Sequence, residues 1–296
     1  MNKRIDLHIH TTKSDGVLTP KEVIDEANKN GVYAIAIADH DTVEAYCEEL
    51  FEYASNKNVK LITAVEISTK INKCGIHVLG YNFDLGNKEF QNKLYKIRNA
   101  RHDYLHKVTE KLNELGYYLN EEELDKIDAV TKAHIALDVI NNEKNKEVLV
   151  NNFGHIPNKG EFIETIMNEN CPAYVKKEAV TPKQAAEIIK MAGGKVVLAH
   201  PVAYIYEDNL NDEDILSIVK DMKPDGLEAN YLYVDRNNNK IDETEKWNEF
   251  AKNNNLFVTI GSDFHNKDGI HPEIGFVNTN FCLDDKTIDE ILNNII

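Results

Sequence analysis

The chain of 296 residues is long enough to bury one barrel-sized domain, or one domain with an insertion. Its 50 Asp and Glu outnumber 34 Lys and Arg, and the net charge of −16 repels a long phosphate backbone, which argues against duplex nucleic acid as a partner. Four cysteines without a pairing pattern, and no apolar leader or run of membrane-spanning length, predict a soluble, cytoplasmic protein without membrane contact.

The first predicted strand covers residues 5–9, where apolar and polar residues alternate. Because a strand repeats every two residues, His8 and His10 fall on one face, where a metal ion could bridge them. Two histidines at this spacing also occur by chance. Their meaning therefore depends on the rest of the chain.

Helix, glycine and strand then follow one another as they do in a β/α barrel. Thr19 and Glu22 form a predicted capping box around Pro20, and an apolar run at 32–38 comes after the helix. The same pattern returns at 181–199. Further predicted strands lie at 59–65, 76–81, 226–229 and 257–260, and further helices at 44–56, 242–253 and 284–296.

Residue types that bind metals occur in or just after the predicted strands. They are Asp39-His40-Asp41, Glu66, His77, His200 and Asp263-Phe264-His265. The alternative interpretation makes them core histidines and surface carboxylates. Apolar strands adjoin six of the eleven histidines, however, and burying an unpaired imidazole there is costly. Since the carboxyl ends of barrel strands meet at one face, we expect these side chains to meet there.

Residues 88–174 break the alternation of strand and helix. A long amphipathic helix is predicted first and ends at Gly116, with the apolar face Phe90, Leu94, Ile97, Leu105, Val108, Leu112 and Leu115. Shorter helical segments follow at 120–127, 131–141, 144–152 and 160–169. We therefore expect a helical insertion between two barrel strands.

Taken in order, these motifs resemble those of the polymerase and histidinol phosphatase (PHP) family. The matching stretches are Asp6-Leu7-His8-Ile9-His10, Ser14-Asp15-Gly16, Asp39-His40-Asp41, the surroundings of Glu66 and His77, Leu198-Ala199-His200-Pro201 and Gly261-Ser262-Asp263-Phe264-His265. The chain most resembles the stand-alone phosphoesterases that act on nucleoside 3',5'-bisphosphates and short oligonucleotides. The resemblance implies an α/β fold, a distorted seven-stranded TIM-like barrel of residues 1–87 and 175–296, with 88–174 as a helical cap.

The resemblance also implies nine residues that are both metal ligands and catalytic: His8, His10, Asp15, His40, Glu66, His77, His200, Asp263 and His265. Nine ligands are too many for one ion. We expect two or three divalent ions, of manganese, zinc or iron, because imidazole and carboxylate suit all three metals. Three sets are implied: His8, His10, Glu66 and Asp263; Glu66, His77 and His200; and Asp15, His40 and His265. Asp39 and Asp41 are expected to support these ligands.

The function implied is hydrolysis of phosphate monoesters of small nucleotides, or of the ends of short oligonucleotides, by a hydroxide that bridges the metal ions. One alternative is a phosphomonoesterase like histidinol phosphatase, although Ser14-Asp15-Gly16 lacks the Cys-x-His type of continuation expected there. Another alternative is a non-catalytic metal-binding PHP module, although the chain has no polymerase-sized extension.

Substrate binding is assigned by the resemblance to cations of the insertion and its end: Arg98, Arg101, Lys132, His134 and Lys176. Lys132 stands where the family tends to have arginine, so the two-pronged hydrogen bonding of a guanidinium is lost. For each cation the alternative is a solvated surface charge.

Three other residues leave their roles open. His102 and His106 are spaced four apart on a predicted helix and could bind zinc, but they lack the glutamate of an HExxH motif. Glu228 ends a predicted strand, where it could contact substrate or support a ligand.

Overall fold

The computed structural model describes residues 3–126, 130–176, 179–235, 237–277 and 283–296. The chain forms two compact units, one of residues 1–95 and 180–296 and the other of residues 96–179. The helix α3 (Lys88–Glu114) begins in the first unit and continues in the second. We call residues 1–95 and 180–296 the barrel unit and residues 96–179 the insertion unit.

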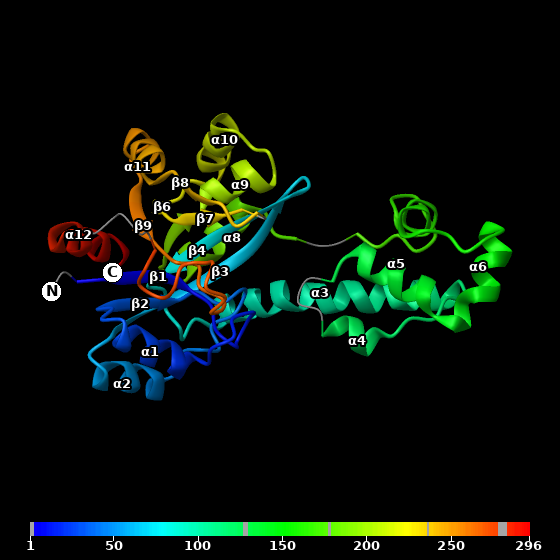
Figure 1. Cartoon of the computed structure of the whole chain (residues 1–296), viewed down its shortest axis with the longest axis horizontal. Helices are drawn as coiled ribbons and strands as arrows, with labels where there is room; N and C mark the ends of the chain where they lie inside the picture. The colour runs from blue at the N-terminus through cyan, green and yellow to red at the C-terminus, as the bar shows by residue number, and fades with distance from the viewer. Residues whose placement is uncertain (1–2, 127–129, 177–178, 236, 278–282) are drawn as a thin grey trace. The chain divides into compact units, whose positions relative to one another are not determined.

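Seven strands of the barrel unit form one mixed sheet in the order β1-β2-β3-β4-β5-β6-β9 (Figure 1). They are β1 (Ile5–Ile9), β2 (Ala34–Ile37), β3 (Lys60–Ile71), β4 (Cys74–Tyr81), β5 (Lys195–Leu198), β6 (Gly226–Asn230) and β9 (Phe257–Ile260). A parallel bridge from Ile9 to Phe264 brings the last strand's end back to the first strand. The nearly closed sheet confirms the predicted distorted TIM-like barrel.

One strand runs against the others and accounts for the distortion. β4 pairs antiparallel with both β3 and β5, whereas the remaining pairs are parallel. Only Asn72 and Lys73 separate β3 from β4, too few residues for the crossover that a parallel pair needs. Because β4 is reversed, His77 near its beginning lies at the same barrel end as residues that follow the parallel strands.

The first strand departs from strict alternation. Its register with β2 shifts between Asp6 and Ile9. Leu7 packs in the cluster that contains the small side chains of β2 and β3, whereas Ile9 packs with the cluster of α1 and α2. The two histidines still meet, with 3.1 Å between the Nε2 atoms of His8 and His10.

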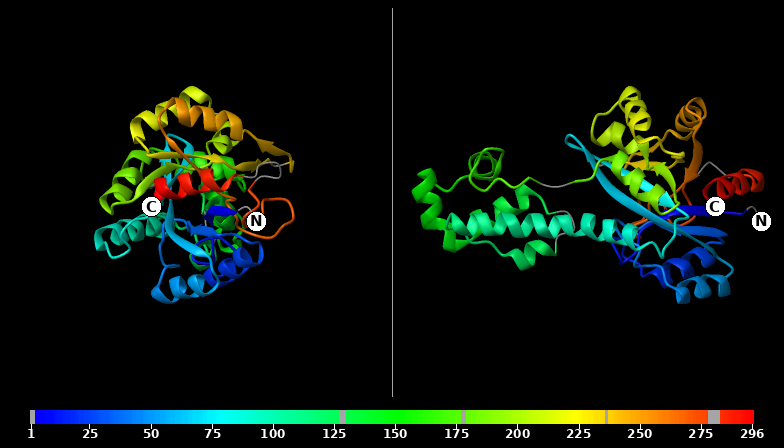
Figure 2. Two further views of the ribbon diagram at one scale, coloured as in Figure 1. Left: turned by 90° about the vertical axis from the view of Figure 1, so that its left-hand side faces the viewer. Right: turned by 180° about the vertical axis from the view of Figure 1, so that it is seen from behind.

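Helices cover the outside of the sheet in the barrel unit (Figure 2). They are α1 (Pro20–Lys29), α2 (Glu48–Asn56), α8 (Pro182–Met191), α9 (Pro201–Glu207), α10 (Asp212–Met222), α11 (Thr244–Asn253) and α12 (Asp285–Ile295). The capping boxes predicted at Thr19 and Thr181 are confirmed. α2 begins four residues later than predicted, because the Tyr46 hydroxyl is held by the carbonyls of Ile37 and Ile62.

Four elements were not predicted from the sequence. α9 follows His200 directly, and α10 begins at a capping box of Asn211 and Asp214. A two-stranded sheet of β7 (Leu232–Val234) and β8 (Lys240–Asp242) lies in the Asn-rich stretch expected to be a loop. Strands of three residues are too short to show alternation in a sequence.

The insertion unit has an apolar core of its own, which includes Leu105, Val108 and Leu112 from the predicted face of α3. Its other helical segments are α4 (Glu121–Asp125), α5 (Lys132–Asn141), the 3-10 turn η1 (Glu143–Asn145), α6 (Lys146–Phe153), α7 (Lys159–Phe162) and the π-helical turn η2 (Ile163–Met167). Among the described residues of the whole chain, no helix is long and apolar enough to cross a membrane.

The C-terminal helix seals the barrel core. Ile288, Ile291, Leu292 and Ile295 of α12 join the cluster that lines the sheet, and Lys3 at the other end of the chain bonds to Asp285 and Asp289 of the same helix. Lys3, next to the first strand, therefore lies at α12 (Figures 1 and 2).

We predict that Ile291→Ala lowers the free energy of unfolding by about 2–5 kcal/mol, because it leaves a cavity under α12. Urea unfolding of the metal-free protein, followed by the fluorescence of Trp247, measures the loss in the barrel unit. Ile296→Ala is the matched control, since Ile296 is 53% exposed. Equal effects of the two substitutions would contradict the packing role of α12.

Candidate metal centre

Nine side chains that the sequence singled out come together at one end of the barrel. They are His8 and His10 of β1, Asp15 of the following loop, His40 after β2, Glu66 of β3, His77 of β4, His200 after β5, and Asp263 and His265 after β9. We call these nine residues the ligand cluster.

The carboxylate of Glu66 stands at the middle of the ligand cluster. Its Oε2 lies 3.3 Å from His8 Nε2, 3.2 Å from His10 Nε2 and 3.3 Å from His40 Nδ1. Its Oε1 lies 3.0 Å from His77 Nδ1 and 3.1 Å from His200 Nε2. One buried carboxylate thus faces five imidazoles from four segments of the chain.

Three overlapping groups of ligand atoms are close enough to hold an ion. They are His8, His10, Glu66 and Asp263; His10, Asp15, His40 and His265; and His40, Glu66 and His77. The first coincides with a set implied by the resemblance, the second adds His10 to another, and the third has His40 in place of His200. His200 lies beside the third group, because its Nε2 contacts Glu66 of that group.

The separations between these atoms fit a metal ion. Ligands at 2.0–2.1 Å from a tetrahedral ion lie roughly 3.3 Å from one another. In the first group, Asp263 Oδ1 is 3.4 Å from His8 Nε2 and 3.1 Å from His10 Nε2. Asp263 Oδ1 and His200 Nδ1 are buried and have no hydrogen-bond partner among the described residues. Imidazole nitrogens and carboxylate oxygens that converge at these separations suit a divalent cation.

The charges in the ligand cluster are strongly coupled. Burial lowers the pKa of His8, but the negative charges of Glu228, Glu66 and Asp263 outweigh it and raise the pKa well above its usual value. Burial likewise lowers the pKa of His10, and carboxylates including Asp15 raise it well above its usual value. Without metal, therefore, these carboxylates hold protons on the two imidazoles of β1.

The pKa values of His40 and Asp15 are lowered instead. Burial, together with the neighbouring imidazoles of His10 and His77, lowers the pKa of His40 to about 3 although Glu66 opposes this. Burial would raise the pKa of Asp15, but hydrogen bonds from His10 and His265 bring it below its usual range. A neutral imidazole and an ionised carboxylate are the forms that bind metal.

Buried aspartates hold the backbone around the ligand cluster. Asp39 accepts bonds from the Thr11 N–H, the Thr11 hydroxyl and the Ser14 hydroxyl, at 2.6–2.7 Å, and so shapes the loop that carries Asp15. Asp41 accepts from the Ser68 N–H at 2.8 Å. The expected supporting role of these two aspartates agrees with these contacts.

A pocket of about 410 Å³ opens onto the ligand cluster. Tyr204, Tyr231, Glu207 and Asp208 line it beside the ligands, and sequence analysis missed all four. The Tyr231 hydroxyl donates to Asp263 Oδ2 at 3.3 Å, and the Tyr204 hydroxyl accepts from the His77 N–H at 2.8 Å. Tyr204 and Glu207 lie in α9, Asp208 follows this helix, and Tyr231 lies between β6 and β7. No pattern in the sequence marks any of them.

The predicted substrate cations lie in the insertion unit, where the described contacts of Lys132 and His134 are with other residues. Lys132 donates to Asn168 at 3.0 Å, and His134 completes the capping box of α5 with Thr131. Lys176 is exposed, Arg98 lies on α3, and the side chain of Arg101 is outside the described residues. Their binding of substrate remains a prediction.

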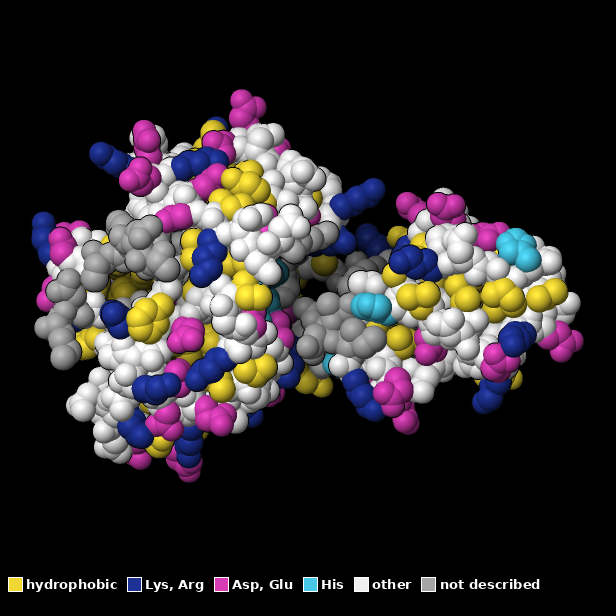
Figure 3. Space-filling model, viewed as in Figure 1, with side chains coloured by type: hydrophobic (Ala, Val, Ile, Leu, Met, Phe, Trp, Pro, Cys, Tyr) yellow, Lys and Arg dark blue, Asp and Glu magenta, His cyan; other side chains and the backbone are white. Residues whose placement is uncertain are grey.

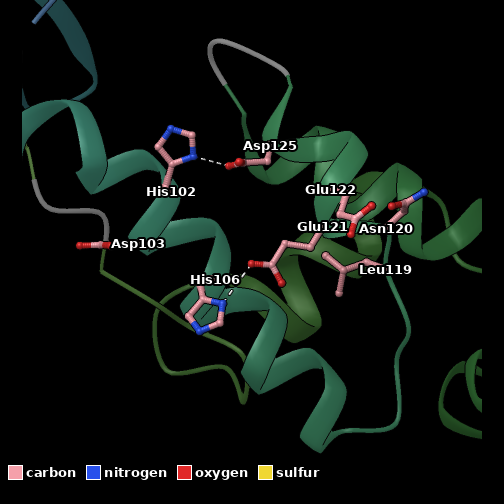
Figure 4. A pocket seen from close by; sticks show the side chains of 8 residues that line it. All are labelled: His102, Asp103, His106, Leu119, Asn120, Glu121, Glu122 and Asp125. Atoms are coloured by element: carbon pink, nitrogen blue, oxygen red, sulfur yellow. Dashed lines mark hydrogen bonds and ion pairs between the residues drawn. The ribbon is translucent and has the colours of Figure 1, made fainter. Parts of the chain in front are cut away.

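His102 and His106 face carboxylates instead of each other (Figure 4). His102 Nδ1 bonds to Asp125, and His106 Nδ1 lies 3.0 Å from Glu121, both on α4. The metal-sized groups found among the described residues all belong to the ligand cluster. These two pairs therefore join α3 to α4 within the insertion unit.

Comparison with known proteins matches residues 6–223 to the PHP domain. A 5'-3' exoribonuclease of Haemophilus influenzae is 32% identical over 90% of this chain and 91% of its own length. A 3',5'-nucleoside bisphosphate phosphatase of Chromobacterium violaceum is 25% identical over 88% of this chain and 87% of its own. The structure of an amidohydrolase from Chromobacterium violaceum, with bound sulfate, superposes with a TM-score of 0.65 at 22% identity, over 99% of this chain and 97% of the other. That likeness shows the fold.

We predict that metal binding releases protons, because the raised pKa values of His8 and His10 keep these rings protonated in the metal-free protein at pH 7. Calorimetric titration with Zn²⁺ in two buffers of different ionisation enthalpy should show at least one proton released per chain, and weaker binding at lower pH. His155→Ala, in the insertion unit, should leave the release unchanged. Heats that do not depend on the buffer would contradict the assignment.

Proposed function

This chain belongs to the PHP domain family and is a metal-dependent phosphoesterase, and on that premise we propose that it removes phosphate from small nucleotides, such as nucleoside 3',5'-bisphosphates, or acts at the ends of short oligonucleotides. The observation that carries the proposal is the convergence of three ligand groups on the Glu66 carboxylate beneath one pocket. We further propose that the nine residues of the ligand cluster hold two or three divalent ions.

Bound divalent ions supply a nucleophile from water at neutral pH and offset the charge of a phosphoryl group. The chain's part is to hold the ligands in place and to receive the phosphate. Hydrolysis forms a bond from a water oxygen to phosphorus and breaks the ester bond, and the leaving oxygen takes up a proton.

Pocket size and charge favour a small substrate. A volume of about 410 Å³ is in the range of small-molecule sites. Glu207 and Asp208 line the same pocket and would repel a long run of phosphates. On the face seen in Figure 3 the acidic and basic side chains are interspersed among the described residues, without a broad basic surface for a nucleic-acid chain. These features support a mononucleotide or a chain end.

The named relatives leave two products to distinguish. A phosphatase releases inorganic phosphate from a nucleoside 3',5'-bisphosphate, whereas an exoribonuclease releases mononucleotides from RNA. Relatives of both kinds match most of this chain. Product analysis with both substrates separates the two activities, and a histidinol-phosphatase-like activity would show as turnover of an amino alcohol phosphate instead.

We predict that Asp263→Asn lowers kcat on the preferred substrate by more than the roughly 10- to 100-fold typical of lost outer partners of a metal ligand. The reason is that Asp263 belongs to the first ligand group. Asp221→Asn is the control, because this carboxylate is exposed on α10 and 3.9 Å from Lys183. Retained turnover by Asp263→Asn after incubation with Mn²⁺ would reject the ligand set, and absence of turnover and of metal in the unaltered protein would favour the non-catalytic alternative.

We propose that Arg98, Arg101, Lys132, His134 and Lys176 bind the phosphate that does not react. Arg101→Ala and His134→Ala should then raise KM for a nucleoside 3',5'-bisphosphate by about tenfold, equivalent to ~1.4 kcal/mol, and change KM for an aryl phosphate much less. Thr131→Ala is a matched control for His134, because it removes the same capping box without removing the imidazole. Equal losses on the two substrates would assign these residues to the fold or the chemistry.

A further inference from the structure

Glu228 is a buried carboxylate that none of the ligand groups contains. It lies in β6 and is 0% exposed. Its carboxylate accepts bonds from two different ligand residues. His8 Nδ1 lies 3.0 Å from Oε1 and 3.2 Å from Oε2, and the His200 N–H donates to Oε2 at 2.9 Å. One side chain therefore touches two ligands that belong to different strands.

The contact with His8 decides which ring nitrogen faces the metal position. A carboxylate only accepts hydrogen bonds, so the proton of a neutral His8 ring must lie on Nδ1. The lone pair then lies on Nε2, which faces Glu66 Oε2 at 3.3 Å and Asp263 Oδ1 at 3.4 Å. A carboxylate on the far nitrogen is the usual means of orienting a histidine ligand.

The contact with His200 holds the backbone conformation of that residue. His200 has φ 22° and ψ 61°, in a region that residues other than glycine rarely adopt, at the point where β5 ends and α9 begins. The bond from its N–H to Glu228 holds this conformation. The same conformation directs His200 Nε2 to Glu66 Oε1, at 3.1 Å.

Close packing around Gly261 holds His8 and Glu228 in place. A Cβ atom at this position would lie 2.2 Å from His8 Cβ and 2.4 Å from Glu228 Oε1. Both contacts are far inside van der Waals distance. Glycine is needed here so that the His8 ring and the Glu228 carboxylate can lie against the backbone that leads to Asp263.

We propose that Glu228 is a positioning residue that sets two metal-ligand groups at once, through the ring of His8 and the backbone of His200. The inference rests on the metal centre of the proposed function. It also settles the two roles left open by the sequence: Glu228 orients ligands and does not contact substrate.

Glutamine cannot replace Glu228, although it has the same shape. Its amide has one accepting oxygen, and its NH₂ group only donates. If the NH₂ faces the His200 N–H, two donors oppose each other. If it faces His8 Nδ1, that nitrogen must accept and the proton moves to Nε2, the atom that faces the metal position. Either orientation disturbs one ligand.

The test is the metal affinity of the full chain carrying Glu228→Gln, measured by competition with a chromophoric chelator for Zn²⁺ and for Mn²⁺. We expect affinity to fall by about 10- to 100-fold. Asp225→Asn is the matched control and should bind like the unaltered protein, because Asp225 precedes the same strand and, among the described residues, its carboxylate accepts from the backbone of Val196, at 2.9 Å, and from no metal ligand. Trp247 fluorescence checks that each variant is folded.

Unchanged metal affinity of Glu228→Gln would overturn the inference, as would a raised KM for substrate with full metal content. A second measurement needs no variant. Nitrogen NMR of the unaltered protein loaded with Zn²⁺ should show a His8 ring protonated at Nδ1, and protonation at Nε2 would contradict the inference. Failure of the unaltered protein to bind Zn²⁺ or Mn²⁺ would reject the metal centre itself, which is a different result.

Discussion

The structure depends on one constraint, the need to gather five imidazoles around the buried carboxylate of Glu66. A carboxylate alone has about four positions for hydrogen bonds, so it cannot satisfy all five rings. Positive ions placed between nitrogen and oxygen remove that conflict. Because the rings come from β1, β4 and the ends of β2 and β5, they meet only when the sheet curls into a nearly closed barrel.

One strand of the curled sheet is reversed. The tight connection from β3 to β4 removes one crossover helix, and it lets the long β3 carry Glu66 and then turn back with His77. His77 Nδ1 comes within 3.0 Å of Glu66 for that reason. The reversal of β4 distorts the barrel, and it also brings the beginning of this strand to the barrel end that holds the ligand cluster.

A layer of buried carboxylates holds the ligands from behind. Asp6 accepts from the Ser262 and Gly275 N–H groups at 2.9 Å, Asp39 shapes the loop after β1, and Glu228 orients His8. Burying several carboxylates would be very unfavourable without these donors. Their negative charge also matches a positively charged centre. The same hydrogen bonds therefore both orient the ligands and stabilise this end of the barrel.

Sequence alone determined the repeating units and the kinds of residue at strand ends, because capping boxes such as that of Thr19 and apolar runs are local signals. With the family resemblance it also supplied the nine ligand types and the barrel. Only the tertiary structure decided that β4 is antiparallel, that His10 and His40 each reach two ligand groups, and that Glu228 orients His8. The contact between His8 and Glu228 joins residues more than two hundred positions apart, and no local pattern encodes a distance of that kind.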